Sequence, residues 1–475
     1  MTATVALPLW LFLILLAFAA WAAGVLLLMP SMRWFFRRRI NRVIEDINTR
    51  LQLELPSFKL TRREVLVDRL FHDPKVQSLI EHQARESGEP LMELRRRVDA
   101  YAREIIPAFN AFLYFRIGYW LSKVVAKSLY RVRLGYLDEA GLAAVDPKSS
   151  VVFVINHRSN MDYVLVAFMA AERTALSYAV GEWARVWPLQ ALVRSLGAYF
   201  VRRNSGDPLY RAVLSRYVQM ATEAGVPQAL FPEGGLTVDG ALRAPKFGLL
   251  DYMVKSFDPK GERDLVFIPV GINYDRVLED RSQLLKLDPD RRRPGMARAL
   301  ATTLGFAMHN LRLAASRRWY RLGYACVNFG SPVSLRQYVR DTNINFASLD
   351  DEARRPVVAA LGNRLMQSIG AVIPVVPVAL VAHVFRADPG KARSELDIKA
   401  AASALLEDWE RRGVHVYIPR GDRDYAIGVG LRMLELRHIV DESDGMYAPV
   451  QANLPLLNYY ANSIAHVAEA PVLTV

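Results

Sequence analysis

The sequence has very little cysteine: Cys326 is the only one among 475 residues. A single cysteine excludes a disulfide within the chain and is typical of a reducing compartment. Cys326 also lies inside an apolar run, where a thiol is usually inert. A serine nucleophile has no better support, because the chain has no G-x-S-x-G segment. A mechanism through a covalent enzyme intermediate is therefore not favoured.

Motifs for binding metals or nucleic acids are missing as well. The eight histidines are scattered, without an H-E-x-x-H motif or a paired-histidine spacing. We therefore expect no metal and no other cofactor, and a metal-dependent hydrolase has little support. The formal net charge of +13 favours an anionic partner. Because zinc-finger spacing, an RNP-like motif and a basic zipper are absent, we expect membrane lipid as that partner and no nucleic acid.

Charge is absent from one long segment, Val5–Met29. This segment exceeds the roughly 20 residues that a helix needs to cross a bilayer. No lysine or arginine precedes it, and the arginines behind it place the rest of the chain in the cytoplasm by the positive-inside rule. We therefore expect a single-pass membrane protein, in the inner membrane if it is bacterial. A cleaved signal peptide, suggested by the alanine-rich residues 17–23, is the minor alternative. The arginines are Arg33, Arg37, Arg38, Arg39 and Arg42.

Composition and periodicity divide the chain into four regions. Residues 1–31 form the predicted anchor, and residues 32–127 have the three- and four-residue apolar spacing of amphipathic helices. In residues 128–340, short apolar runs alternate with helical patterns, which predicts an α/β domain with a mostly parallel sheet. Residues 341–475 are helical in pattern. The predicted strands are Val151–Ile155, Ala229–Phe231, Leu265–Val270 and Tyr324–Phe329.

Two apolar stretches need separate interpretation. Residues 109–130 are rich in aromatic side chains and carry spaced basic residues. They are expected either in the membrane interface or packed against the core, and the sequence favours neither. Residues 371–385 contain two prolines and are too short for a second membrane crossing.

The segment VVFVINHRSNMDY, residues 151–163, carries the most informative pattern. A β-branched run ends in a polar turn that contains His157 and, five residues later, Asp162. On a continuous helix these side chains would point roughly 140° apart, so pairing requires the tight turn that asparagine and serine favour. A carboxylate there would orient the imidazole as a base for a hydroxyl group. For an isolated pair, a capped loop in which both groups only satisfy each other is equally acceptable.

Three further segments follow: GAYFVRR at 197–203, FPEGGLT at 231–237 and IPVGINYD at 268–275. With the His-x4-Asp segment, they resemble in order and spacing the glycerolipid acyltransferase superfamily. The combination is specific, although no single segment is.

The resemblance extends beyond these four segments. Residues 327–339, VNFGSPVSLRQYV, and residues 456–466, LLNYYANSIAH, are similar to later parts of the long glycerol-3-phosphate acyltransferases. The short lysophosphatidate acyltransferases lack such a region. The resemblance covers most of the chain after about Leu113. It implies an α/β acyltransferase core flanked by helical regions.

The resemblance also implies roles for individual residues. His157 and Asp162 would be catalytic, and Pro269 would line the acyl-donor site. The implied reaction is direct transfer of a fatty acyl group from acyl-CoA or acyl-carrier protein to glycerol 3-phosphate, which gives lysophosphatidate. Adjacent guanidinium groups also suit a bidentate phosphate clamp, with a solvated pair at a strand end as the alternative. The expected acceptor-binding residues are Gly197, Arg202, Arg203, Glu233, Gly234, Gly235 and, as a further basic candidate, Lys246.

One position departs from the family pattern. Members typically continue the Glu-Gly segment with Arg-Ser, whereas this chain has Leu236 and Thr237. The missing guanidinium removes a charged hydrogen bond worth roughly 1.5 to 3 kcal/mol. Either Arg243 or Lys246 compensates, or the acceptor is dihydroxyacetone phosphate or a lysophospholipid. A catalytically silent lipid-binding scaffold is the alternative from another class, with Leu236 as its only support.

Overall fold

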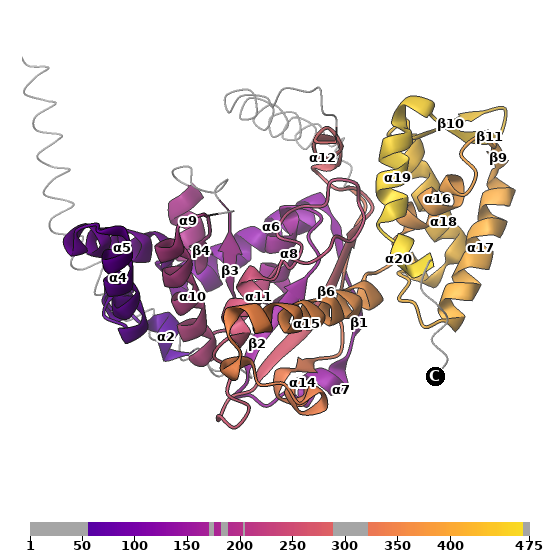
Figure 1. Ribbon diagram of the computed structural model, residues 1–475. Coiled ribbons are helices and arrows are strands. Elements are labelled where there is room, and N and C mark those ends of the chain that lie inside the picture. Colours follow the sequence, from indigo (N-terminus) through magenta and orange to yellow (C-terminus); the bar gives the residue numbers. More distant parts are fainter. Residues whose placement is uncertain (1–55, 171–174, 182–188, 203–204, 288–321, 469–475) are drawn as a thin grey trace, which may run out of the picture.

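The computed structural model describes residues 56–170, 175–181, 189–202, 205–287 and 322–468. A central sheet carries helices, and a second group of helices lies beside the sheet at the C-terminal side (Figure 1). The predicted membrane segment Val5–Met29 lies outside the described residues. Within the described ranges, no helix combines the length and the apolar character that a membrane crossing requires.

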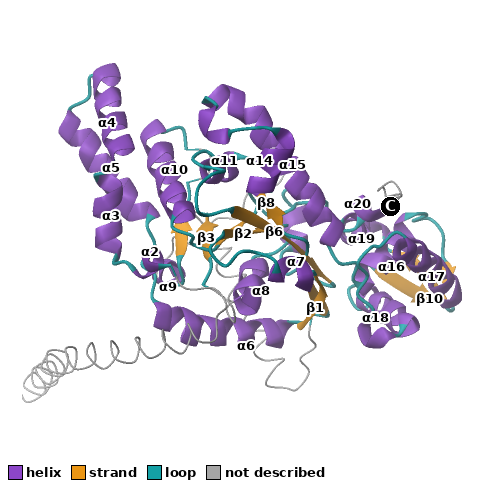
Figure 2. Ribbon diagram, turned by 90° about the horizontal axis from the view of Figure 1, so that it is seen from below, coloured by secondary structure: helices purple, strands orange, loops and turns teal. Residues whose placement is uncertain are grey.

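The prediction of a mostly parallel sheet is confirmed. Neighbouring strands are parallel except where β6 meets β7 and β8. Helices cover both faces of the sheet (Figure 2). The order across the sheet is β1 (Arg131–Leu137), β7 (Tyr324–Phe329), β6 (Leu265–Tyr274), β2 (Ser150–Ile155), β5 (Gln228–Leu230), β3 (Ser177–Val180) and β4 (Ala198–Phe200), and β8 (Val333–Ser334) pairs with β6.

The four predicted strands are present as β2, β5, β6 and β7. All residues of β2 and β6 are buried, as expected for strands that are covered on both faces. Strand β6 begins at the predicted residue, but it continues beyond Val270 to Tyr274. The extra residues pair with β7, where Gly271 lies opposite Asn328 and Tyr274 opposite Ala325. The strand therefore reaches the turn that carries His157.

The predicted helices before the sheet are also present. They include α4, which begins after the capping residue Asp73 and ends at Gly88 in the left-handed conformation. Helix α5 buries Leu94 and Val98 completely and packs against α10. The bounds are α2 (Ser57–Leu60), α3 (Arg63–Phe71), α4 (Pro74–Ser87), α5 (Leu91–Ile105) and α10 (Pro208–Glu223).

Residues 109–130 pack against the core along one face, and their placement in the membrane interface stays a prediction. A π-helical turn (Leu113–Gly118) leads into α6 (Tyr119–Leu129), which packs on α8 (Met161–Ala170). The ring of Tyr119 stacks on Phe168 with centroids 5.9 Å apart, and Ala126 is fully buried. The opposite face is exposed although it is apolar. Its exposed side chains are Ile117, Trp120, Leu121 and Val124.

Further helices complete the layers around the sheet. Helix α11 packs against α10, and α15 runs along β6 toward the C-terminal helices (Figure 1). The bounds are α7 (Glu139–Ala143), α9 (Leu189–Ser195), α11 (Gly248–Val254), α12 (Asp280–Leu284), α14 (Leu335–Thr342) and α15 (Asp351–Val372).

The C-terminal region contains a small sheet that we did not expect. Strands β10 (Val440–Ser443) and β11 (Met446–Pro449) form a hairpin, and β9 (Arg393–Ser394) pairs with β11. Asp444 and Gly445 form its two-residue turn with positive φ angles of 54° and 76°. An Asp-Gly pair is a hairpin signal, but the strands are too short and polar for periodicity to show.

The C-terminal helices share a core with the sheet. Helix α16 is buried at their centre, and its Leu380 belongs to the same apolar cluster as Ile155 of β2 and Tyr459 of α19. This core joins residues from both sides of the boundary that the sequence places between residues 340 and 341. The division into four regions stays a prediction. The bounds are α16 (Pro377–Arg386), α17 (Glu395–Arg411), α18 (Arg423–Glu435), α19 (Leu454–Asn462) and α20 (Ala465–Ala468).

Candidate active site

The predicted pairing of His157 and Asp162 is present in the structure. Strand β2 ends at Ile155, a tight polar turn follows, and α8 begins at Met161. The turn brings Nδ1 of His157 within 3.0 Å of Oδ2 of Asp162. Both side chains are almost completely buried. When Nδ1 donates to the carboxylate, Nε2 is left as the nitrogen that can accept a proton.

Asp162 is held from three further sides. Its Oδ2 accepts the backbone N–H groups of Arg158 at 2.7 Å and Ser159 at 3.0 Å. Its Oδ1 accepts the hydroxyl of Tyr274 at 2.5 Å. Burial, together with the nearby charge of Asp162, raises the pKa of Tyr274 well above its ordinary value, so this hydroxyl stays a donor. The carboxylate therefore has a fixed orientation toward His157.

The rest of the turn is also fastened. The side-chain amide of Asn156 donates to the carbonyl of Ile272 at 2.9 Å and accepts its N–H at 2.8 Å. Glu279 accepts the hydroxyl of Ser159 at 2.7 Å and the side-chain amide of Asn160 at 3.0 Å. These bonds explain the polar residues of the turn, which brace it against β6 and the segment that follows β6.

Glu233 supports the turn and does not line the pocket. Its Oε1 accepts the N–H of His157 at 2.7 Å, and its Oε2 accepts the N–H of Arg243 at 3.0 Å. Burial raises the pKa of this carboxyl group. The adjacent Gly234 has a φ of +66°, and a Cβ there would lie 2.6 Å from Cδ of Lys246. Glycine thus lets the lysine stem cross the loop, while Gly235 is buried behind it.

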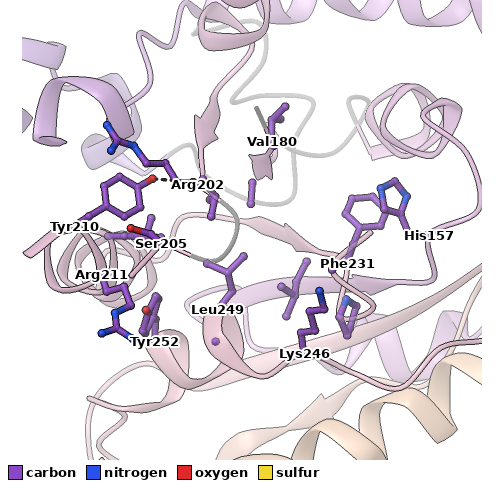
Figure 3. A pocket seen from close by; sticks show the side chains of 18 of the residues that line it. His157, Val180, Arg202, Ser205, Tyr210, Arg211, Phe231, Lys246, Leu249 and Tyr252 are labelled. Carbon is purple, nitrogen blue, oxygen red and sulfur yellow. Dashed lines mark hydrogen bonds between the residues drawn. The ribbon is translucent and has the colours of Figure 1, made fainter. Parts of the chain in front are cut away.

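An elongated pocket of about 390 Å³ opens beside His157. It lies at the C-terminal ends of β2, β3, β4 and β5, where open α/β sheets usually bind ligands. Figure 3 shows His157 and Phe231 at one end, Arg202 and Arg211 at the other, and Lys246 near Phe231. The apolar lining of the pocket includes Val180, Val201, Leu214, Leu230 and Leu249.

The guanidinium of Arg202 is occupied by an acidic partner. It donates to the two carboxylate oxygens of Glu104 on α5 at 2.9 and 2.5 Å. The rings of Tyr101 and Tyr210 lie 5.1 and 4.9 Å from it. The hydrogen bond to Glu104 raises the pKa of Arg202. A phosphate would compete with Glu104 for this guanidinium, and Arg203 lies outside the described residues.

Two predicted site residues are not brought to this pocket. Gly197 precedes β4 at the end opposite Val201, and its φ of +90° together with the nearby carbonyl of Leu176 explains why glycine is needed there. Pro269 lies within β6 opposite Val154 and is buried. Neither residue lines the pocket, so their roles in substrate binding stay predictions.

The two candidates for replacing the missing arginine differ in position. Arg243 donates to the backbone carbonyl of Leu236 at 3.3 Å at the exposed edge of the loop. Lys246 lines the pocket. In the described part of the chain, no carboxylate lies within ion-pair distance of its ammonium group. Lys246 is therefore the cation better placed to meet a ligand.

Four residues of the site were missed by the sequence analysis. Tyr274 and Glu279 contact the turn from distant parts of the chain, Arg158 follows His157 directly, and Arg211 lies on α10. The only available signal was the position of Tyr274 within the IPVGINYD segment.

Cys326 has the character expected of an inert thiol. It is fully buried in β7, and burial raises its pKa to about 12. Among the residues that the structure describes, no group of three His, Cys, Asp or Glu side chains is arranged to hold a metal ion.

Two protein-family models match parts of the chain and support the resemblance. Residues 137–273 match the acyltransferase family model, and residues 309–474 match the model of the glycerol-3-phosphate acyltransferase C-terminal region. A crystal structure of 1-acyl-sn-glycerophosphate acyltransferase from Thermotoga maritima aligns with 54% of this chain and 80% of its own, at 17% identity and a TM-score of 0.31.

Curated relatives match a larger part of the chain. A glycerol-3-phosphate acyltransferase from Pseudomonas putida is 25% identical over 435 residues, which are 87% of this chain and 50% of the relative. One from Xanthomonas campestris is 27% identical over 372 residues, which are 76% of this chain and 41% of the relative. The chain thus spans about half the length of the curated relatives it matches. With an acyltransferase domain followed by this C-terminal region, the chain belongs to the glycerol-3-phosphate acyltransferase family.

Proposed function

We propose that the chain transfers a fatty acyl group from acyl-CoA or acyl-carrier protein to a hydroxyl of glycerol 3-phosphate, giving lysophosphatidate. The observation that carries this proposal is the buried His157–Asp162 pair at the end of a pocket lined by Lys246, whose ammonium group has no carboxylate within ion-pair distance among the described residues. Membership in the family supports the choice of acceptor. The thioester donor is inferred from the reaction class.

The geometry supports direct attack by the acceptor. Nε2 of His157 takes the proton of the acceptor hydroxyl while the oxygen forms a bond to the thioester carbonyl carbon. The carbon–sulfur bond then breaks, and the leaving thiolate takes the proton back from the imidazolium. Asp162 holds Nδ1–H and stabilises the positive charge between these steps, as the acid does in catalytic triads. Its three other hydrogen bonds keep it in place during the cycle.

Lys246 is the proposed partner of the acceptor phosphate. It lines the pocket near Phe231, at the same end as His157 (Figure 3). Its ammonium group would take the place of the arginine side chain that family members typically have at the position of Leu236. Arg202 is the second candidate, because a phosphate would compete with Glu104 for its guanidinium. Dihydroxyacetone phosphate and a lysophospholipid stay the alternative acceptors, since both carry a phosphate and a free hydroxyl.

The apolar lining of the pocket suits an acyl chain. Val180, Leu214 and Leu249 line it, and apolar walls with a few polar groups are typical of ligand pockets. We place the donor acyl chain there, with its thioester carbonyl beside His157.

Membrane attachment is also proposed. The predicted crossing at residues 5–29 would anchor the chain, with the catalytic region in the cytoplasm. The exposed face of the helix at residues 113–129 gives a second contact, because Ile117, Trp120 and Val124 are apolar and solvent-exposed. The basic Arg116 and Lys127 are exposed on the same helix. This arrangement is typical of helices that lie in the headgroup region of anionic membranes.

An acceptor panel tests the proposal. Membranes that contain the protein are supplied with labelled glycerol 3-phosphate, dihydroxyacetone phosphate or a lysophospholipid, and with each thioester donor. We expect acylation of glycerol 3-phosphate that is absent from membranes with the His157→Ala variant. Acylation of another acceptor alone would overturn the headgroup assignment and keep the reaction class. Activity with none of them would favour the silent scaffold.

A further inference from the structure

Arg158, the residue after His157, carries a fully buried guanidinium. Only 2% of the residue is exposed. Its Nη1 donates to the carbonyl of Gly240 and its Nη2 to the carbonyl of Ser463, both at 2.7 Å. No carboxylate lies within ion-pair distance of it in the described ranges, and burial lowers the pKa of its guanidinium. Burying a cation without an acidic partner is energetically unfavourable. We therefore expect the Arg158 side chain to have a specific role.

The two carbonyls belong to segments that are far apart in sequence. Gly240 lies in the loop after Glu233, whereas Ser463 lies between α19 and α20, 305 residues after Arg158. The two segments touch directly: a Cβ at Gly240 would lie 1.9 Å from the carbonyl oxygen of Tyr459. The backbone of α19 therefore packs against the loop at a distance that only glycine permits.

Other hydrogen bonds join the same two regions. The side-chain amide of Asn462 donates to the carbonyl of Asp239 at 3.0 Å. The amide of Asn273 on β6 donates to the hydroxyl of Ser463 at 3.2 Å and to the carbonyl of Pro374 at 2.9 Å. The turn between α19 and α20 is thus bonded to the loop, to β6 and to the turn that holds His157.

Arg158 connects this junction to the catalytic pair through its own backbone. Its N–H donates to Oδ2 of Asp162, the oxygen that also accepts Nδ1 of His157. A shift of Arg158 would therefore move one of the donors that orient Asp162. The side chain of Arg158 fixes its position by binding two carbonyls outside the turn.

We propose that the C-terminal region takes part in catalysis: the α19–α20 turn, through Arg158, holds the His157–Asp162 pair in its reactive geometry. Arg158 is then a positioning residue that does not touch substrate. The proposal deepens the proposed function and rests on it for the activity measurement. If Arg158 serves stability alone, its loss would lower the melting temperature and leave turnover by the folded protein unchanged.

The test compares Arg158→Met with Arg354→Met in the full chain. Arg354 on α15 serves as a control, because it is 3% exposed and donates to the carbonyl of Leu349 and to the carboxylates of Asp251 and Asp351, none of which lines the pocket. At a temperature where both variants are folded, Arg158→Met should lower kcat about 10- to 100-fold with little change in either KM. Arg354→Met should keep kcat within about 2-fold of the wild type.

Amide hydrogen exchange gives a readout that does not depend on activity. Residues 157–163 should exchange faster in Arg158→Met and at the wild-type rate in Arg354→Met. Unchanged kcat and unchanged exchange in Arg158→Met would overturn the proposal. If Arg158→Met does not fold, Arg158→Lys replaces it with the same expectations. The lysine ammonium group cannot reach both carbonyls at once as the planar guanidinium does. A wild-type protein without acyltransferase activity would defeat the proposed function, while the exchange comparison would still decide the role of Arg158.

Discussion

The hydroxyl of Tyr274 lies 2.5 Å from Oδ1 of Asp162, the carboxylate oxygen that His157 does not use. Residues from β6 and from the turn after β2 thus orient one carboxylate from both sides. A second buried tyrosine, Tyr130, packs its ring against Tyr274, with centroids 5.2 Å apart. Its hydroxyl donates to the carbonyl of Arg276 rather than to Asp162.

We predict that Tyr274→Phe lowers kcat by about 10-fold and leaves both KM values nearly unchanged, because the carboxylate loses one orienting donor. Tyr130→Phe removes a buried hydroxyl from the same aromatic pair and should keep the wild-type kcat. Steady-state kinetics of the two purified variants checks this. Equal kcat losses in the two variants would show that the hydroxyl of Tyr274 acts only through stability.

Lys246→Met should raise the KM for glycerol 3-phosphate by about 10- to 100-fold, with a much smaller effect on the donor KM. Methionine keeps most of the stem that crosses Gly234 and removes the charge. Arg243→Met is the control, since that guanidinium contacts only the carbonyl of Leu236 among the described residues. A larger effect from Arg243→Met would assign the phosphate to the exposed edge of the loop.

The apolar face at residues 117–124 predicts a membrane contact that can be measured apart from the N-terminal anchor. A chain that begins at Met32 should still bind vesicles with anionic lipids, more weakly than the full chain and less as salt is raised. Trp120→Glu, at the most exposed of these positions, should weaken that binding further. Vesicle sedimentation checks both points. Equal binding of neutral and anionic vesicles, or no effect of Trp120→Glu, would contradict this surface.

Asp275 predicts a pH dependence of stability. It is fully buried, and burial raises its pKa from 3.8 to about 6, although it accepts the N–H groups of Tyr324 and Val378. Because the folded-state pKa is raised, this group contributes most to stability below about pH 4, and that contribution is lost as the pH rises through about 6.

Asp275→Asn cannot ionise, so the change of melting temperature between pH 4 and 6 should become flatter in this variant. The variant should also be less stable at neutral pH, because the two N–H groups bond to different carboxylate oxygens and the amide places its NH2 group, a donor, opposite one of them. Thermal unfolding in detergent across this pH range measures both effects. A slope equal to that of the wild type would show that Asp275 does not titrate there.

The sequence predicted those parts of the molecule that depend on neighbouring residues. The buried strands were visible as continuous apolar runs, as in Val151–Ile155, and the turn that pairs His157 with Asp162 followed from its asparagine and serine residues. The end of β6 was not predicted, because its last residues are held by pairing with β7.

Contacts between distant segments could not be predicted in the same way. Arg202 is bound by Glu104, 98 residues earlier, and Tyr274 reaches Asp162 across 112 residues. The motif that contains Arg202 gave no sign that an acidic partner on α5 occupies it. Likewise, nothing near Arg158 in sequence indicates that its guanidinium binds the turn at Ser463.

The most direct test of His157 as the base is the initial rate at which purified His157→Ala protein forms labelled lysophosphatidate from glycerol 3-phosphate and a thioester. We expect a rate lower by at least about 1,000-fold, with expression, membrane retention and melting temperature close to the wild type, because the only proposed base is lost. A wild-type rate from this variant would contradict the assignment of His157 and Asp162 as the catalytic pair.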